Sequence, residues 1–371
     1  VLISFTTSCA TGPSPKETDN SDSTKDAPSR SLTRPKTEGV TSPQQLTSMG
    51  QNFDGVFTAD GKSIFFIRAE RPEHKQPQLY QMNLESGDTR RVSYHDGHDQ
   101  NPTPFNLNTN VIYASTTDEI KEHPKFIERA LNKKMSADAK NSKSKTPISW
   151  SQSGFELYLS DPEGREIERL TTSRFFDGHP SLSPDDKKLI FVSSRASNST
   201  DLFEMNIASQ GIQPLTQTQS FEAHPDLSPL NGSLIWTQYG PQKNQSQLII
   251  RNKEGSEDKL LQLEKGLYLS PKWHPSLENW LVFSAQRDEH PQQKELYAYD
   301  TESDCLVRLT FHQSDDILPN WHPNGETILF TRSHDREKQL YTLDFKVESS
   351  ACSQSSSSVD SNHESQKDGS R

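Results

Sequence analysis

Short apolar runs bounded by turn-forming residues recur along most of the chain. Residues 64–67 and 328–331 are examples, and both runs are rich in β-branched or aromatic side chains and follow a turn that contains glycine. Runs of this length and composition are typical of strands rather than helices. The pattern therefore predicts an all-β protein over most of the sequence.

The runs are grouped into units that repeat with a regular period. Each unit ends on an apolar residue, and successive ends lie 46, 78, 45, 48 and 46 residues apart. Units of roughly 40–45 residues built from four short strands are typical of the blades of a β-propeller. The unit ends are Leu46, Val92, Leu170, Leu215, Leu263 and Leu309.

Second strands can be recognised six times, which predicts a six-bladed propeller over residues 40–345. The sixth unit stops at Phe345 without a closing strand, whereas residues 44–47 precede the first unit without a blade of their own. We therefore expect this N-terminal strand to complete the last blade, because such a closure leaves no large unpaired sheet edge.

The regions on either side of the propeller differ from it in composition. Residues 1–9 contain a short apolar run followed by small residues and Cys9, which resembles the end of a bacterial lipoprotein signal peptide with Cys9 as the lipidated residue. A frayed terminus with an incidental cysteine is the alternative. Residues 10–39 are too polar to bury a core and are expected to form a disordered tether. The serine-rich residues 346–371 are expected to be disordered as well.

An insertion between the second and third strands of blade two explains the one long spacing. Residues 116–154 begin with a capping-box spacing and continue with apolar positions on one face of a predicted helix. Two interpretations stay open, a partner-docking helix or an elaboration that packs on its own blade. The docking candidates are Phe126, Ile127, Ala130 and Leu131.

Charge narrows the possible partners. The 371-residue chain has a net charge of −11 with charged residues spread throughout, which disfavours nucleic-acid binding. The first apolar run is too short to span a bilayer, so the lipid at Cys9 is the only membrane attachment expected. We expect a monomer without a cofactor.

The repeats resemble the TolB-like family of bacterial propellers, also described as WD40-like or PD40 repeats. The shared pattern is Asp-x-x-Pro, a Ser-Pro-Asp-Gly-like turn, an apolar strand, an Arg, a Leu-Tyr strand and a closing Leu-Thr, as in residues 177–216. The resemblance covers residues 40–345 and implies a six-bladed ring in a periplasmic or outer-membrane setting. It implies no particular activity, because one fold hosts many functions. TolB itself also has an α/β domain in front, where this chain has the predicted tether.

His179 and His224 precede prolines at equivalent positions of adjacent blades, and inner strands face the channel of a propeller. With Asp226 as a third ligand they could hold a metal ion, as in some propeller-type lyases that degrade pectate. However, His274 and His322 also precede prolines, which indicates that His-Pro is part of the repeat. We therefore expect no metal site.

Other polar and aromatic positions recur in the repeats. The Asp near each blade start and the Arg after the second strand are expected to join neighbouring blades, because partly buried charges need partners. Trp273 and Trp321 are expected in the core or at the channel mouth, where a stacked pair could bind a sugar ring. Cys305 and Cys352 are not expected to pair. The Asp and Arg residues are Asp54, Asp99, Asp177, Asp316, Arg68, Arg195, Arg287 and Arg332.

Two functions remain. The favoured one is a non-catalytic propeller of the bacterial cell envelope that binds a protein partner through its channel mouth or the insert. The alternative is a channel-site enzyme, a metal-assisted lyase or a hydrolase, that acts on glycan or peptide fragments. The absence of a nucleophile, metal or phosphate-binding motif favours the first. Candidates for ligand contact in the channel are His179, His224, Asp226, Trp273 and Trp321.

Overall fold

The computed structural model describes most of the propeller region. The described residues are 39–70, 76–95, 97–117, 154–173, 175–196, 199–240, 245–253, 255, 257–287, 291–335 and 337–347. All of them belong to the compact unit Lys36–Arg371. Cys9, residues 10–38 of the predicted tether, the tail beyond residue 347 and the docking candidates Phe126, Ile127, Ala130 and Leu131 lie outside them, so the expectations for those segments stay predictions.

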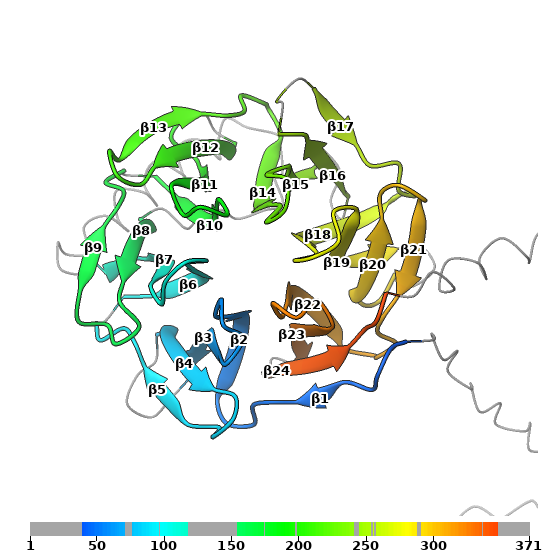
Figure 1. Ribbon diagram of the computed structural model, residues 1–371, viewed down its shortest axis with the longest axis horizontal. Coiled ribbons are helices and arrows are strands. Elements are labelled where there is room, and N and C mark those ends of the chain that lie inside the picture. The colour runs from blue at the N-terminus through cyan, green and yellow to red at the C-terminus, as the bar shows by residue number, and fades with distance from the viewer. Residues whose placement is uncertain are drawn as a thin grey trace, which may run out of the picture. The chain divides into compact units, whose positions relative to one another are not determined.

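Six four-stranded antiparallel sheets are arranged in a ring, as Figure 1 shows, and all regular elements of the described residues are strands. The first three blades contain β2 (Gln51–Phe57), β3 (Ser63–Ala69), β4 (Gln78–Asn83), β5 (Thr89–Arg91), β6 (Asp99–Pro104), β7 (Val111–Ser115), β8 (Glu156–Ser160), β9 (Ile167–Arg169), β10 (Asp177–Leu182), β11 (Lys188–Ser193), β12 (Asp201–Asn206) and β13 (Gly211–Pro214). The last three contain β14 (Phe221–Leu227), β15 (Leu234–Tyr239), β16 (Ser246–Arg251), β17 (Asp258–Leu260), β18 (Gly266–Trp273), β19 (Trp280–Arg287), β20 (Glu295–Asp300), β21 (Cys305–Arg308), β22 (Asp315–Trp321), β23 (Thr327–His334), β24 (Glu337–Asp344) and β1 (Gln44–Gln45). The predicted all-β, six-bladed propeller is confirmed.

The N-terminal strand closes the ring as predicted. β1 pairs antiparallel with β24, with Gln44 opposite Thr342 and Gln45 opposite Tyr341. The N–H of Leu46 extends this contact by donating to the carbonyl of Leu340 at 2.8 Å. The two ends of the propeller region are therefore held in one sheet. In the described part of the chain, no helix is long and apolar enough to cross a membrane.

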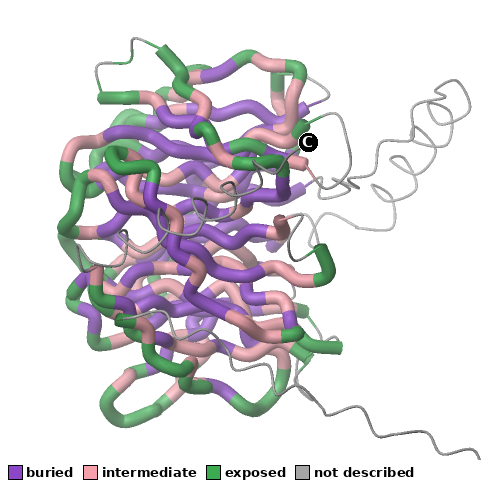
Figure 2. The backbone as a smooth tube through the Cα atoms, turned by 90° about the vertical axis from the view of Figure 1, so that its right-hand side faces the viewer, coloured by how far each residue is buried: buried purple, intermediate pink, exposed green. Residues whose placement is uncertain are grey.

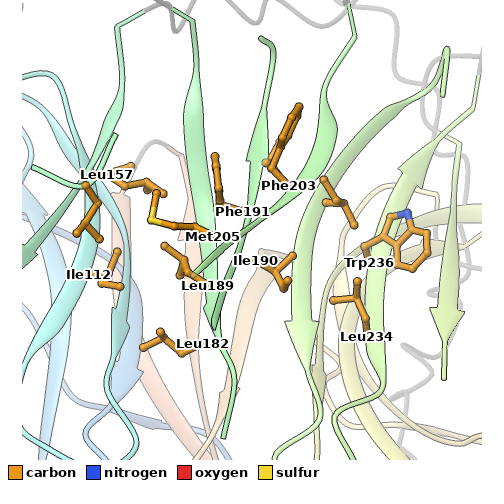
Figure 3. Close-up of a cluster of buried hydrophobic side chains, with 14 of the residues drawn as sticks. Ile112, Leu157, Leu182, Leu189, Ile190, Phe191, Phe203, Met205, Leu234 and Trp236 are labelled. Carbon is orange, nitrogen blue, oxygen red and sulfur yellow. The ribbon is translucent and has the colours of Figure 1, made fainter. Parts of the chain in front are cut away.

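The apolar core lies between adjacent blades. Figure 2 shows buried residues along the strands and exposed residues at their ends. Five of the six residues of β11 are buried, and their side chains pack against blades two and four. Figure 3 shows this cluster, in which Leu157 of blade two and Trp236 of blade four lie on either side of blade three. The second strands are buried on both faces, which explains why they are continuous apolar runs in the sequence.

The closing Leu-Thr of the repeat positions a hydroxyl that serves two partners. Thr171 Oγ1 accepts the N–H of Leu157 at 2.9 Å and donates to Glu156 Oε2 at 2.6 Å. At the end of blade three, Thr216 accepts the N–H of Leu202 and donates to Glu222. The hydroxyl thus joins the third strand to a buried carboxyl group.

Replacing Thr171 with valine is expected to lower the free energy of unfolding by about 1–3 kcal/mol, because valine has the same shape but leaves a buried N–H and a buried carboxyl group without their partner. Chemical denaturation measures the loss. The matched control is Thr109→Val, at an exposed turn position, which is expected to change little. Equal losses at the two sites would contradict this role of the hydroxyl.

The expectation that the Asp and Arg residues join neighbouring blades holds for Asp54 and Asp99. Asp99 Oδ2, in blade two, accepts the N–H of Leu79 of blade one at 3.1 Å, and Asp54 accepts from blade two. The expectation is wrong for the Asp–Arg pairs, which lie within one blade. Arg332 lies directly opposite Asp316 within blade six, and its Nε donates to Asp316 Oδ1 at 2.7 Å. Arg195 likewise contacts Asp177 within blade three, with 2.6 Å between Nη2 and Oδ2. Opposite residues on paired strands are close enough for direct contact, which favours partners in the same sheet.

Blades one and five depart from this pairing. Asn52, and not Asp54, is the residue opposite Arg68, and its Oδ1 accepts from Arg68 Nε at 2.6 Å. Arg287 contacts Glu264. Asp54 therefore does not belong with Asp99, Asp177 and Asp316, and its surroundings are described below.

Cys305, in β21, forms a disulfide. The other two cysteines of the sequence, Cys9 and Cys352, lie outside the described residues. Val347, at the end of the described residues, packs against the cluster that contains Cys305. The chain therefore leaves the ring beside this cysteine.

Candidate channel site

The inner strand of every blade has a β-bulge at the same place, and these six bulges surround the channel. The pairing of inner and second strands shifts register at this point in all six sheets. The first residue of each bulge has a positive φ, a conformation that is uncommon for residues other than glycine. These residues are Asp54, Asn101, His179, His224, Ser270 and Leu318.

The second bulge residue is proline in five blades, which explains the proline of the Asp-x-x-Pro pattern. A bulge takes this position out of the ladder, and proline has no N–H that would be left unpaired there. Blade one has Gly55 instead, where an added Cβ would lie 2.9 Å from a methyl group of Leu329. The close contact with blade six requires the glycine. The prolines are Pro102, Pro180, Pro225, Pro271 and Pro319.

The bulge residues of the first four blades form a chain of hydrogen bonds from blade to blade. The N–H of Asn101 donates to Asp54 Oδ2 at 2.7 Å, and the N–H of His179 donates to Asn101 Oδ1 at 3.3 Å. The N–H of His224 then donates to His179 Nδ1 at 3.3 Å. Polar contacts that join neighbouring blades therefore occur in the channel, and these side chains have a structural role there.

His179 and His224 lie together, as their equivalent positions predicted, but as a stacked pair. Their ring centroids are 4.3 Å apart and the ring planes differ by 17°. Because His179 Nδ1 accepts a hydrogen bond, the proton of its neutral ring is on Nε2. Desolvation, with a smaller effect of Lys272, lowers the pKa of His179 to about 4. Desolvation also places the pKa of His224 well below its ordinary value, so both rings are neutral at pH 7.

Asp226 faces the channel two residues beyond His224, and both of its oxygens have partners. Lys272 Nζ donates to Oδ1 at 2.8 Å, and the N–H of Trp273 donates to Oδ2 at 2.9 Å. Burial raises the pKa of Asp226, and the adjacent Lys272 opposes that rise. Asp226 is therefore the carboxylate of an ion pair between blades four and five.

Trp273 and Trp321 are buried wall residues, each 6% exposed, in two different core clusters. The ring of Trp321 contacts His274 and Phe345, with centroid distances of 4.6 and 6.4 Å. The stacked pair considered as a sugar-binding platform is therefore not an exposed platform.

His274 and His322 have the structural role that the His-Pro recurrence indicated. His274 Nε2–H donates to the carbonyl of Gly325 at 2.9 Å, and His322 Nε2–H donates to the carbonyl of Gly61 at 3.1 Å. Each contact joins the turn of one blade to the turn of the next. These histidines lie away from the neck of the channel.

The channel has a narrow neck that opens into a wider funnel on one face of the ring. The neck has a volume of about 60 Å³ and is lined by the bulge residues together with Lys272. The funnel has a volume of about 300 Å³, and Val56, Thr103, Lys272 and Asn320 line both parts. The apolar residues of the funnel wall include Phe57, Phe105, Leu182, Leu227, Trp273 and Trp321, and polar residues such as Thr58, Asn106, Ser181 and Asp226 line it as well.

The turns between first and second strands form the rim of the funnel, and three of them expose a leucine. Leu107, Leu230 and Leu277 are 72%, 44% and 38% exposed. Prolines from three blades complete the rim, namely Pro229, Pro275 and Pro323. The sequence analysis missed this surface. In the sequence, this rim could have been recognised by an apolar residue at the tip of an otherwise polar turn.

The sequence matches no known protein-family model and no curated protein sequence. Solved structures with a similar fold include TolB from Acinetobacter baumannii, with 18% identity and a TM-score of 0.57, covering 76% of this chain and 60% of the length of that protein. A protein described as TolB from Agrobacterium tumefaciens is 14% identical, with a TM-score of 0.54, and the match covers 81% of this chain and 93% of that one. The fold is that of a TolB-like propeller.

The TolB-like propeller also shares its fold with oligogalacturonate lyases. The enzyme from Vibrio parahaemolyticus is 15% identical, with a TM-score of 0.52, covering 83% of this chain and 81% of that one. Another such lyase was solved in complex with manganese. Identities this low establish the fold and no activity.

The channel residues of this TolB-like propeller do not fit a metal ion. The imidazoles of His179 and His224 are stacked, and His179 Nδ1 and both oxygens of Asp226 already accept hydrogen bonds. Among the described residues, no group of three or more His, Cys, Asp or Glu side chains is placed to hold a metal ion. The three residues considered as ligands therefore act as contacts between blades.

The shifted pKa values predict opposite effects of two substitutions on acid stability. Since the pKa of His179 is about 4 in the folded protein and near 6.5 in the unfolded chain, the unfolded chain binds the proton first as the pH falls. Stability is lost over that window by up to about 3 kcal/mol. Burial raises the pKa of Glu156 to about 7, so that group stabilises the fold as the pH falls from about 7 to 4.5.

His179→Asn keeps an acceptor for the N–H of His224 and removes the titrating ring, so we expect a shallower loss of stability between pH 6.5 and 4. Glu156→Gln is expected to make the loss steeper. Denaturant unfolding of the wild type and both variants across this range measures the slopes. If both variants changed the slope in the same direction, the opposite pKa shifts of His179 and Glu156 would be contradicted.

Proposed function

We propose that this TolB-like propeller is a non-catalytic protein-binding scaffold of the bacterial cell envelope, attached to a membrane through a lipid on Cys9. The observation that carries the proposal is the funnel, an opening of about 300 Å³ with both apolar and polar lining residues, on a face built from short turns. Exposed apolar groups around a concave centre are typical of protein interaction sites. The mouth of a rigid ring suits a partner that inserts part of its chain.

The state of the channel residues supports a binding role over catalysis. His179 and Asn101 accept backbone hydrogen bonds from the next blade, and Asp226 is held by Lys272 and the N–H of Trp273. A catalytic base needs a free lone pair within reach of substrate, with a pKa suited to the working pH. The imidazoles of His179 and His224 have strongly lowered pKa values, so they are weak bases at neutral pH.

The lyase fold relatives favour one alternative, a channel-site enzyme acting on oligogalacturonate, and this is directly testable. Full-length protein incubated with oligogalacturonates and Mn²⁺ is expected to form no unsaturated product. Formation of the product, and its loss in His224→Ala, would replace the binding proposal with an enzymatic one.

An extracytoplasmic location is supported by the disulfide of Cys305, because stable disulfides are rare in the reducing cytosol. We propose Cys352 as its partner, since Val347 packs against the core cluster that contains Cys305 and lies five positions before Cys352 in the sequence. Non-reducing peptide mapping of protein isolated from cells is expected to recover the two cysteines in one linked fragment. Lipid attachment is tested by metabolic labelling with a fatty acid, which Cys9→Ser is expected to abolish.

The binding role is tested by affinity capture from an envelope extract. The bait is the full chain, and two variants are compared with it, a Leu230→Ser/Leu277→Ser double variant and a chain without residues 116–154. We expect one partner that is lost with the leucine variant. Loss only with the shortened chain would assign binding to the insert, and equal, empty captures would refute the scaffold role.

A further inference from the structure

The funnel face has an excess of negative charge around its apolar centre. The described turns on this face carry the carboxylates of Asp60, Glu85, Asp88, Asp161, Glu163, Glu166, Asp185, Asp186, Glu257, Glu278, Glu302, Asp304 and Glu326. The cationic side chains on this face are Lys62, Arg165, Lys187 and Lys253 of the same described turns, and Lys346, which pairs with Glu326 at 3.6 Å. The face therefore has a negative potential that a binding partner meets before it makes contact.

Several of these carboxylates are held in place by their own turns. Asp60 accepts the hydroxyl of Thr58 at 2.7 Å and the N–H of Lys62 at 3.0 Å. Asp185 accepts the hydroxyl of Ser183 at 2.7 Å. These hydrogen bonds lower the pKa of both carboxyl groups, so they remain ionised in mildly acidic solution. Their charges are fixed in position before a partner binds.

The apolar groups lie inside this ring of charge. The turn that contains Asp185 is joined to the turn of blade two, where the N–H groups of Asn106 and Leu107 donate to Asp186 at 2.9 and 2.8 Å. The exposed side chain of Leu107 is thus anchored directly beside a carboxylate. A buried apolar centre with a charged rim is the usual arrangement of a protein interface.

From this arrangement we infer that the occupant of the funnel is a polypeptide segment with apolar side chains flanked by lysine or arginine. The inference rests on the proposed scaffold function and adds the chemistry of the partner. The apolar side chains enter the funnel between Leu107, Leu230 and Leu277, while the cations contact the carboxylates of the surrounding turns. An acidic glycan such as oligogalacturonate is repelled by the same charges.

Three fluorescent peptides test the inference with the full-length protein. They share one apolar core of leucine, proline and tryptophan and differ only in their flanks, which are lysine, serine or glutamate. We expect the lysine-flanked peptide to bind at least tenfold more tightly than the serine-flanked one, and the glutamate-flanked peptide not to bind. The preference is expected to fall several-fold between about 50 and 500 mM salt, since screening weakens exposed charge pairs.

Variants show separately what the rim leucines and the turn carboxylates contribute to peptide binding. Leu230→Ser/Leu277→Ser is expected to weaken the binding of all peptides, whereas Asp60→Asn/Asp185→Asn is expected to reduce the preference for lysine flanks and to leave the serine-flanked peptide unaffected. The matched control is Ile167→Ser, because Ile167 is 47% exposed on the outer strand β9, away from the funnel. Equal binding of lysine- and serine-flanked peptides would overturn the inference and leave the scaffold function in place. Binding of none of the peptides, with capture of a partner still dependent on Leu230 and Leu277, would overturn it as well.

Discussion

Replacing Gly164 with alanine is expected to lower the free energy of unfolding by about 3 kcal/mol or more, far beyond the effect of Gly87→Ala. Both glycines have a positive φ, +70° and +75°, in the turn between third and fourth strands. A Cβ at Gly164 would lie 1.8 Å from the carbonyl oxygen of Val92 in blade one, whereas a Cβ at Gly87 would meet nothing within 4 Å. The backbone strain of about 1 kcal/mol is common to both, and the steric overlap is added only at Gly164.

Chemical denaturation of the two variants measures this difference. Gly87→Ala is the matched control, because it has the same conformation in the equivalent turn of the neighbouring blade. If both variants lost the same free energy of unfolding, the close contact between the turn of blade two and Val92 of blade one would be contradicted.

Replacing Lys272 with methionine is expected to destabilise the ring by about 2–3 kcal/mol at neutral pH, because Asp226 is left charged and poorly hydrated in the channel. Among the described residues that line the neck, Lys272 is the only lysine or arginine. Its side chain is 28% exposed and that of Asp226 is 14% exposed, so the loss is smaller than for a fully buried pair. Losing the cation also raises the pKa of Asp226 further.

The double variant Lys272→Met/Asp226→Asn provides the control for this prediction. It removes both charges, and we expect it to recover much of the lost stability. We also expect the loss in the single variant to shrink at mildly acidic pH, where Asp226 becomes protonated and neutral. A coupling energy near zero at neutral pH would contradict an ion pair that joins blades four and five.

The repeat made the fold predictable because every unit carries the same order of strands and turns. Counting the unit ends was enough to find six blades and to assign residues 44–47 to the last one, which the pairing of Gln44 with Thr342 confirms. Contacts inside the repeat were harder to predict. Asp54 was grouped with Asp99 because both stand near a blade start, yet the ladder places Asn52 opposite Arg68. Asn52 stands two residues before the bulge of blade one, as Asp99 does in blade two. The sequence does not mark the bulge of blade one, because Gly55 replaces the proline there.

The candidate site was predictable in location and not in geometry. The equivalent positions of His179 and His224 correctly placed both rings in the channel. Whether they converge or stack depends on the positive φ of the bulge, which turns each side chain toward the next blade. The channel mouth was predicted as a binding surface, and its candidates Trp273 and Trp321 line the funnel. The rim of the funnel was not foreseen, because it consists of single turn residues such as Leu230.

The most direct test of the scaffold role is photo-crosslinking from the funnel face in bacterial cells that carry the protein in its natural setting. A photoreactive amino acid is placed at Leu230 in one variant and at Ile167 in another. We predict a discrete protein adduct from Leu230 and none from Ile167. Adducts from Ile167 with none from Leu230 would show that the partner meets another part of the ring and would contradict binding through the funnel.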